Sequence, residues 1–343
     1  MPVDGQISRR ARPTGPEVQG KEMSVDPTPA GSRLNRAKIT IKYVSPYAEL
    51  MPIVWLADHT VVFTHIPKAA GTTLYSILED IAADHGLKCL RVMGTLYGQF
   101  LGPGKPDTLA ELRGLSNEAL SAAQFLTGHI PFGVHERIEG KCFYITILRE
   151  PASRLVSHFR YGVERGGWPA DTAIEDLLRD GLLIDNPQTR QLAGLEDPGA
   201  KCTRRTLATA LSNLESHYGI VGVTERFDQV LKALIGLYGW PDLAYTDCQV
   251  TMARIGGELE IKVAEAARRI DALDAELYAW AASREVPWTD GLFAGAARGT
   301  AKQDQVLLTT SMLYYYRREL PPRPSFQSIC DHAMANGDAV EFV

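Results

Sequence analysis

The sequence predicts an α/β fold in which a mostly parallel central sheet is flanked by helices. Two stretches, 61–78 and 142–159, each run from β-branched and aromatic residues through a proline into helix-compatible residues. Repeated strand-turn-helix units are typical of parallel α/β proteins. Ligands of such sheets bind outside the carboxyl ends of the strands. The two corners therefore face one site if their strands, which we expect to end at 63–64 and 147–148, are neighbours.

The length and the composition are consistent with one large domain. The chain has 343 residues, 45% of them hydrophobic, and can bury a substantial core. Residues 1–36 are rich in Pro, Gly, Ser and charge, so we expect a disordered N-terminal segment there, and either Met1 or Met23 as the true start. We expect residues 37–343 to form a single domain with a helical C-terminal part, including one amphipathic helix over about 259–282.

The charge and the cysteines narrow the class of protein. A formal charge of -5 argues against nonspecific nucleic-acid binding. The five cysteines are scattered without a C-x-x-C pair, so they indicate neither a zinc cluster nor a disulfide framework, and a reducing compartment is the simpler interpretation. We find no signal peptide and no run of about eighteen apolar residues. We therefore expect a soluble cytoplasmic protein with no transmembrane segment.

The corner at 64–73 has the features of a phosphate-binding loop. A helix that begins there points its unpaired N–H groups and the positive end of its dipole at an anion. Gly71 lets the backbone approach closely, and Lys68 supplies a positive charge. Thr72 and Thr73 supply hydroxyl donors. Lys68 precedes Gly71, whereas the lysine of a Walker A loop directly follows its last glycine. A corner without a ligand is the alternative interpretation of this stretch.

The corner at 147–159 offers a second anion site. Arg149 follows the predicted strand, and Pro151 begins the helix. The Arg149 guanidinium can bind a phosphate bidentately, and Ser157, about two turns along, can donate another hydrogen bond. We expect Arg154 to have a structural role and to pair with an acid. A P-loop kinase or NTPase needs a magnesium-binding aspartate at such a strand end, and an arginine there disfavours that class.

A third stretch, Phe125–Gly133, contains a candidate base. His129 lies between a glycine and a Pro-containing turn, which predicts a loop-exposed imidazole rather than one buried on an apolar face. Imidazole titrates near neutral pH and is suited to take a proton from a hydroxyl group. A hydrogen-bonded structural histidine is the alternative.

These stretches resemble the sulfotransferases that use 3′-phosphoadenosine 5′-phosphosulfate (PAPS). Their donor-binding loop has the order Pro-Lys-x-x-Gly-Thr-Thr, as residues 67–73 do. Gly-His-x-x-Phe at 128–132 and Leu-Arg-Glu-Pro-x-x-Arg-x-x-Ser at 148–157 resemble two further elements. More narrowly, the pattern is similar to the carbohydrate branch with the heparan sulfate 2-O- and 6-O-sulfotransferases, and to bacterial sulfotransferase family 2. Two departures are Ala69, often threonine in that branch, and Glu150, more commonly aspartate.

The resemblance implies a P-loop-like three-layer fold and transfer of a sulfuryl group from PAPS to a hydroxyl of a glycan, a glycoconjugate or a related acceptor, which needs no metal. The Golgi relatives of the branch are membrane-anchored and this sequence shows no such segment, so we expect a bacterial origin. The resemblance also implies that His129 is the general base and that Lys68 acts in both catalysis and donor binding. The remaining donor-binding residues that it implies are Gly71, Thr72, Thr73, Arg149 and Ser157.

The segment Asp185–Gly194 resembles another element of the branch. It suggests Gln188 and Arg190 as residues that line the acceptor or donor pocket. A capped helix start with a solvated arginine is the alternative. Two other functions stay open for the chain as a whole: a nucleotide phosphotransferase, and a non-catalytic homologue that binds the nucleotide only. The sequence indicates neither the acceptor nor the oligomeric state.

Overall fold

A computed structural model gives the fold of the chain. It describes residues 38–44, 59–84, 86–102, 104–238, 243–245, 253–284, 307–308 and 339–342. All of them belong to one compact unit, Lys38–Val343. The N-terminal segment that we expect to be disordered, 1–36, lies outside the described residues.

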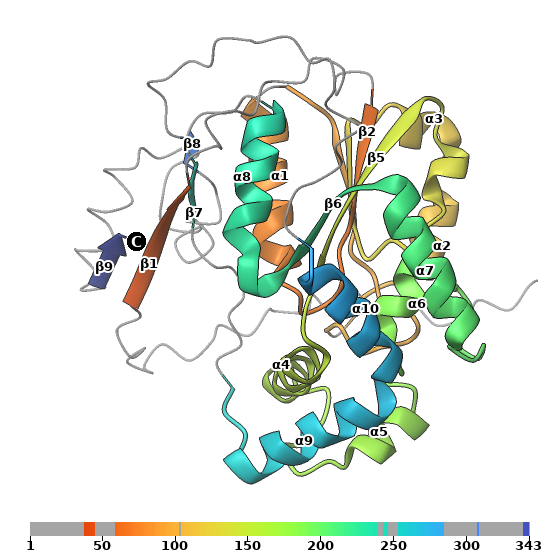
Figure 1. The fold of residues 1–343 in the computed structure, drawn as a ribbon, viewed down its shortest axis with the longest axis vertical. Coiled ribbons are helices and arrows are strands. Elements are labelled where there is room, and N and C mark those ends of the chain that lie inside the picture. Colours follow the sequence, from red (N-terminus) through yellow and green to blue (C-terminus); the bar gives the residue numbers. More distant parts are fainter. Residues whose placement is uncertain are drawn as a thin grey trace, which may run out of the picture. The chain divides into compact units, whose positions relative to one another are not determined.

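The site is built on a five-stranded sheet in which every neighbouring pair is parallel (Figure 1). The strand order is β3-β4-β2-β5-β6. The strands span Cys89–Val92 (β3), Phe125–Gly128 (β4), His59–Thr64 (β2), Lys141–Leu148 (β5) and Tyr218–Val223 (β6). In the register of β2 and β5, Thr64 lies opposite Thr146. The strands that lead to the two predicted anion-binding corners are therefore direct neighbours, as the sequence predicts.

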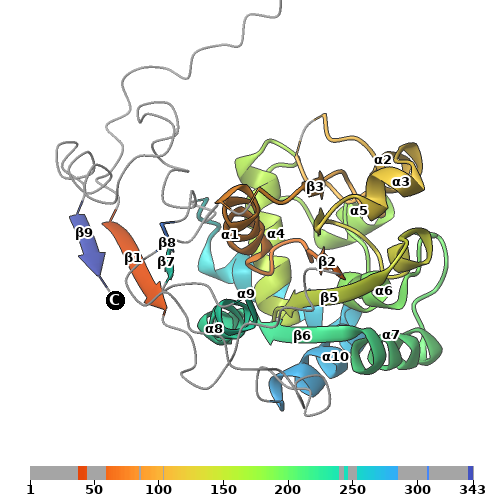
Figure 2. The same cartoon turned by 90° about the horizontal axis from the view of Figure 1, so that it is seen from above.

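Helices cover both faces of this sheet, which gives the expected three layers (Figure 2). One face is covered by α1 (Gly71–Asp84) and α8 (Phe227–Tyr238). The other is covered by α2 (Thr108–Gly114), α3 (Asn117–Ser121), α6 (Pro187–Ala193), α7 (Arg204–His217) and α10 (Ala272–Ala282). Because side chains alternate along a strand, Val61 and Phe63 pack under the first layer and Val62 under the second.

A third group of helices packs together at one end of the sheet (Figure 1). It consists of α4 (Pro151–Glu164), α5 (Ile174–Arg179) and α9 (Gly257–Ile270). Pro151 is the first residue of α4, and the Glu150 carboxylate accepts the N–H groups of Ala152 and Ser153. This N-cap fixes the start of α4 directly after β5.

The remaining described elements do not contribute to the site. Two short 3-10 helices span Val134–Arg137 and Thr224–Arg226. A second sheet has the order β8-β7-β1-β9, with strands Leu307–Leu308, Leu243–Tyr245, Lys38–Val44 and Ala339–Phe342. None of the described helices is long and apolar enough to cross a membrane.

The single helix expected over 259–282 is wrong, because the chain breaks at Asp271 into α9 and α10. Asp271 has φ -108° and ψ 33°, and its carboxylate is fully buried. It accepts the Asn186 N–H at 2.8 Å and lies 3.3 Å from Nη2 of Arg154. The break places this carboxylate between α6 and α4. The predicted structural role of Arg154, paired with an acid, is confirmed.

Replacing Arg154 should destabilise the fold strongly. Arg154 is 1% exposed, so Arg154→Met leaves the Asp271 carboxylate buried without its ion partner. Breaking such a pair on one side costs about 3–5 kcal/mol of unfolding free energy. Arg113→Met is the matched control, because Arg113 and Glu196 form an exposed pair worth less than about 1 kcal/mol. Urea unfolding measures the free energy of unfolding of both variants. Equal losses of this free energy would contradict a stabilising role for the buried pair.

Candidate active site

The loop between β2 and α1 has a strained backbone. Lys68 and Ala70 have φ values of 69° and 58°, in the left-handed region that residues other than glycine rarely adopt. Ala69 between them lies outside that region. Each such residue costs about 1–3 kcal/mol, and such residues cluster where a loop binds ligands. Residues in this conformation also occur in the backbone nests that bind anions.

Lys68 and Arg149 meet at this loop. Nη1 of Arg149 donates a hydrogen bond to the Lys68 carbonyl oxygen at 2.9 Å. Nζ of Lys68 lies 4.2 Å from the centroid of the Tyr161 ring on α4. Burial, and next the charge of Arg149, lower the pKa of Lys68 to about 8. At pH 7 the ammonium form predominates, so two cations lie close together at the carboxyl ends of adjacent strands. An anion bound there relieves their repulsion.

Gly71 permits a close approach, as the sequence predicts, but the group that approaches is a side chain of the protein. A Cβ atom at Gly71 would lie 1.8 Å from Cδ2 of His65. The buried His65 ring stacks on Phe63 with 5.6 Å between ring centroids, and its centroid lies 4.9 Å from that of His129. His65 was not among the site residues predicted from the sequence. Its signal is a polar side chain at the end of a buried strand, directly before the loop.

We expect Gly71→Ala to destabilise the protein, because the new methyl group overlaps the His65 ring and forces it to move. Overpacking of this kind costs about 1–3 kcal/mol. Gly114→Ala is the control: Gly114 is also helical, and a Cβ there meets no atom within 4 Å. Its unfolding midpoint should stay constant or rise. Chemical denaturation compares the two variants. An unchanged unfolding midpoint for Gly71→Ala would show that the His65 ring moves aside at no cost in stability.

His129 lies directly after β4, and the expectation of an exposed imidazole is wrong. The residue is 5% exposed. Gly128 has φ 148°, and its Cβ would lie 1.7 Å from the Val92 carbonyl oxygen, so β4 approaches the end of β3 closely. The His129 N–H donates to that oxygen at 2.9 Å. His129 therefore lies close to the segment that follows β3.

The hydrogen bond of the His129 ring assigns its tautomer. Nδ1 lies 2.7 Å from the Gly94 carbonyl oxygen. A carbonyl oxygen only accepts, so Nδ1 carries the proton and Nε2 keeps a lone pair. Burial lowers the pKa of His129 to about 4, which keeps the ring neutral at pH 7. A neutral ring with a lone pair on Nε2 is able to accept a proton.

The other predicted donor-binding residues lie on the helices that begin at the same two corners. Thr72, half-buried, and Thr73, buried, lie in the first turn of α1, next to the Lys68 loop. Ser157 is half-buried on α4, about two turns from Arg149. The structure brings Lys68, Gly71 and Arg149 together, and it places His129 directly after β4, the strand next to β2.

Gln188 and Arg190 are buried on α6 and bind protein groups. Gln188 pairs with the backbone of Arg149. Arg190 donates to the carbonyl oxygens of Asp185 and Ala200 and to the Asp185 carboxylate. The alternative of a solvated arginine is therefore wrong. A role for either residue in lining a ligand pocket stays a prediction.

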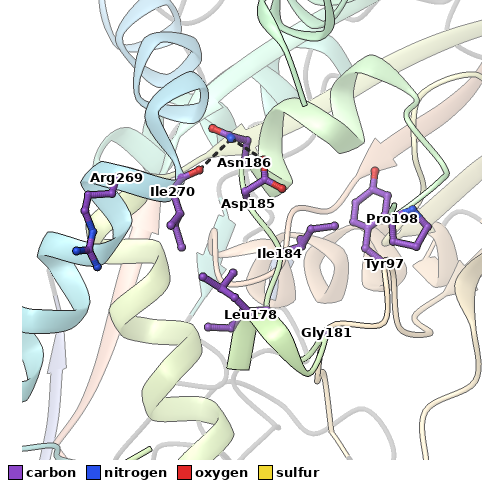
Figure 3. Close-up of a pocket in the computed structure, with 10 residues that line it drawn as sticks. Tyr97, Leu178, Gly181, Ile184, Asp185, Asn186, Pro198, Arg269 and Ile270 are labelled. Carbon is purple, nitrogen blue, oxygen red and sulfur yellow. Dashed lines mark hydrogen bonds between the residues drawn. The ribbon is translucent and has the colours of Figure 1, made fainter. Parts of the chain in front are cut away.

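A surface cavity of about 550 Å³ lies between the α5–α6 connection, the end of α9 and Tyr97 (Figure 3). Two of its polar side chains are engaged: Nδ2 of Asn186 donates to Asp185 and to the Ile270 carbonyl oxygen, and Arg269 pairs with Glu175. Among the residues that the structure describes, the buried Tyr97 hydroxyl has no hydrogen-bond partner. Lys68, His129 and Arg149 are not among its lining residues. Within the described ranges, no group of three or more His, Cys, Asp or Glu side chains is arranged to hold a metal ion.

Comparisons with known proteins find similarity to sulfotransferases. The model of the sulfotransferase family matches residues 52–168. Human galactose-3-O-sulfotransferase 3 is 26% identical over 242 residues, which cover 64% of this chain and 54% of that protein. Mouse heparan sulfate 2-O-sulfotransferase 1 is 22% identical over 194 residues, or 52% of this chain and 54% of that protein. The chain therefore spans about half the length of these relatives.

A comparison of folds finds the crystal structure of mouse sulfotransferase SULT7A1 complexed with PAP, with a TM-score of 0.31 and 14% identity over 61% of this chain and 64% of that one. The family match includes the Lys68 loop, His129, Arg149 and Ser157. Over residues 52–168, this chain is therefore similar to the sulfotransferase family.

Proposed function

We propose that the protein transfers a sulfuryl group from PAPS to a hydroxyl group of a carbohydrate. The observation that carries this proposal is the meeting of the Lys68 and Arg149 corners, joined at 2.9 Å on adjacent parallel strands. PAPS carries anionic groups at its 5′ and 3′ ends. The Lys68 corner offers a cation and N–H groups to one of them, and the Arg149 corner offers a cation and the Ser157 hydroxyl group to the other. The names of the relatives, which specify galactose and heparan sulfate, support a glycan acceptor.

The donor is held from both ends in this proposal. Lys68, Gly71 and the hydroxyl groups of Thr72 and Thr73 bind the 5′-phosphosulfate at the N-terminus of α1. Arg149 and Ser157 bind the 3′-phosphate at the N-terminal half of α4. The Lys68 end combines a charged side chain with a helix start. The Arg149 end combines a charged side chain with a hydroxyl group, because the Glu150 carboxylate already caps α4.

The chemical step needs a base and a stabilised leaving group. Nε2 of His129 takes the proton of the acceptor hydroxyl as its oxygen attacks sulfur, and the bond from sulfur to the 5′-phosphate oxygen breaks. Lys68 offsets the negative charge that builds on that oxygen as the 3′,5′-bisphosphate leaves. The neutral tautomer of His129 and the charged form of Lys68 are the states that these roles require.

The setting of the reaction remains a prediction. The relatives named above come from animals, so they do not support a bacterial origin, and the cytoplasmic location rests on the sequence alone. The phosphotransferase alternative is less favoured, because Arg149 stands directly after β5, where that class places an aspartate.

Incubation with radiolabelled PAPS and a panel of glycans and metabolites tests the proposal. We expect label on a hydroxyl-bearing sugar, without added magnesium. Binding of the bisphosphate with no labelled product from any acceptor would favour a non-catalytic homologue. Magnesium-dependent binding of ATP in place of PAPS would favour the phosphotransferase.

A further inference from the structure

We propose that Gln188 and Gln191 of α6 are positioning residues: Gln188 fixes Arg149, and Gln191 fixes the ends of β2 and β4. This inference rests on the proposed function, because it assigns to Arg149 the 3′-phosphate of the donor. It also gives Gln188 a role other than contact with a ligand.

Gln188 satisfies both backbone groups of Arg149. Its Oε1 accepts the Arg149 N–H at 3.0 Å, and its Nε2 donates to the Arg149 carbonyl oxygen at 2.9 Å. Gln188 is fully buried, so no solvent competes for these bonds. Arg149 occupies the single step between β5 and the cap of α4 at Glu150. The amide therefore sets the backbone from which the guanidinium extends.

Gln188 is itself held by a buried network. The Asp274 carboxylate accepts the N–H groups of Gln188 and Thr189 at 3.1 and 2.7 Å. Oδ1 of Asn186 in turn accepts the N–H groups of Leu273 and Asp274, so the starts of α6 and α10 cap each other. This network leaves Gln188 little freedom to move, which is what a positioning residue requires.

Gln191, one turn further along α6, makes the equivalent contacts with the other two strand ends. Its Nε2 lies 3.1 Å from the His65 carbonyl oxygen and 3.2 Å from that of Ile130. His65 follows β2, before the Lys68 loop, and Ile130 follows His129. One short helix thus contacts the ends of β2, β4 and β5, which together carry Lys68, His129 and Arg149.

The two glutamines make a matched pair for an experiment, because they share a helix, a residue type and near-complete burial. Gln188→Met removes the amide at similar volume and leaves the N–H and carbonyl groups of Arg149 without partners. The planar guanidinium binds a phosphate well only in an accurate orientation. Without a fixed backbone at Arg149, it is no longer oriented toward the 3′-phosphate. Gln191→Met disturbs the 5′ side and His129 instead.

Isothermal titration calorimetry measures the affinities for adenosine 3′,5′-bisphosphate and adenosine 5′-monophosphate, and their ratio reports the 3′-phosphate contact. We expect Gln188→Met to reduce this ratio about tenfold, and Arg149→Ala to reduce it most. Gln191→Met should lower the affinities for both ligands by the same factor. Gln188→Glu keeps an acceptor for the Arg149 N–H, so its affinity ratio should lie between those of the wild-type protein and Gln188→Met. If Gln188→Met does not fold, Gln188→Glu is measured in its place.

The outcomes separate the inference from the proposed function. A wild-type protein that binds the bisphosphate no better than the monophosphate contradicts the donor assignment and this inference together. A normal wild-type ratio that Gln188→Met and Gln188→Glu leave unchanged overturns the inference alone. An equal weakening of both ligands by the Gln188 variants, as for Gln191→Met, shows a general structural role and also overturns it.

Discussion

Lys68→Ala should lower the turnover of sulfuryl transfer by about 10²-fold or more at saturating donor. The ammonium group stabilises the charge that develops on the leaving oxygen, and removing one preorganised charged contact of this kind costs about 3 kcal/mol in the transition state. Its fixed place between α4 and the strained loop means that little reorganisation accompanies the reaction. Initial rates with labelled PAPS and excess acceptor measure the effect.

The control for this prediction is Lys201→Ala, which removes an exposed lysine outside the site. It should leave turnover unchanged, which shows that loss of one positive charge from the protein has no general effect. Near-normal turnover of Lys68→Ala with saturating donor would mean that the lysine contributes to binding alone, or not at all.

His129→Ala should abolish transfer while it leaves donor binding intact. General base catalysis contributes about 10²- to 10⁴-fold, and Nε2 is the lone pair that the Gly94 hydrogen bond leaves for it. The pKa of about 4 predicts the direction of the pH dependence. The ring is neutral above that pH and protonated below it, so kcat/KM of the wild-type protein should fall on the acid side only as the pH approaches 4.

Calorimetry with adenosine 3′,5′-bisphosphate completes the test of His129. Unchanged affinity in the variant supports a role in chemistry, whereas lost affinity would place His129 in the donor site. His217→Ala is the control, since His217 is exposed at the end of α7. This substitution should not change the rate of transfer.

The local course of the chain around the site was predictable from the sequence. The β-branched runs, Pro151 and Gly71 predict two strand-turn-helix corners, and both form. The neighbouring positions of β2 and β5 followed from the expectation that one ligand bridges both corners. The family resemblance added the roles, which neither composition nor periodicity supplies.

Contacts between distant parts of the chain were not predictable. The ring of His129 is buried because Gly94, 35 residues earlier, provides its acceptor. The helix over 259–282 breaks because the Asp271 carboxylate turns toward Arg154, which lies 117 residues away. The family resemblance suggests Gln188 as a ligand contact, yet its amide pairs with the Arg149 backbone, which sequence periodicity cannot locate. In each case a polar side chain selects a partner that only the tertiary fold brings close.

The binding of truncated nucleotides to Lys68→Ala and Arg149→Ala tests the central claim that two corners hold opposite ends of one nucleotide. The ligands are adenosine 3′,5′-bisphosphate, adenosine 5′-monophosphate and adenosine 3′-monophosphate. We predict that Arg149→Ala loses the preference for the bisphosphate over the 5′-monophosphate, and that Lys68→Ala loses the preference over the 3′-monophosphate. Equal weakening of all three ligands by both variants would contradict a two-ended site.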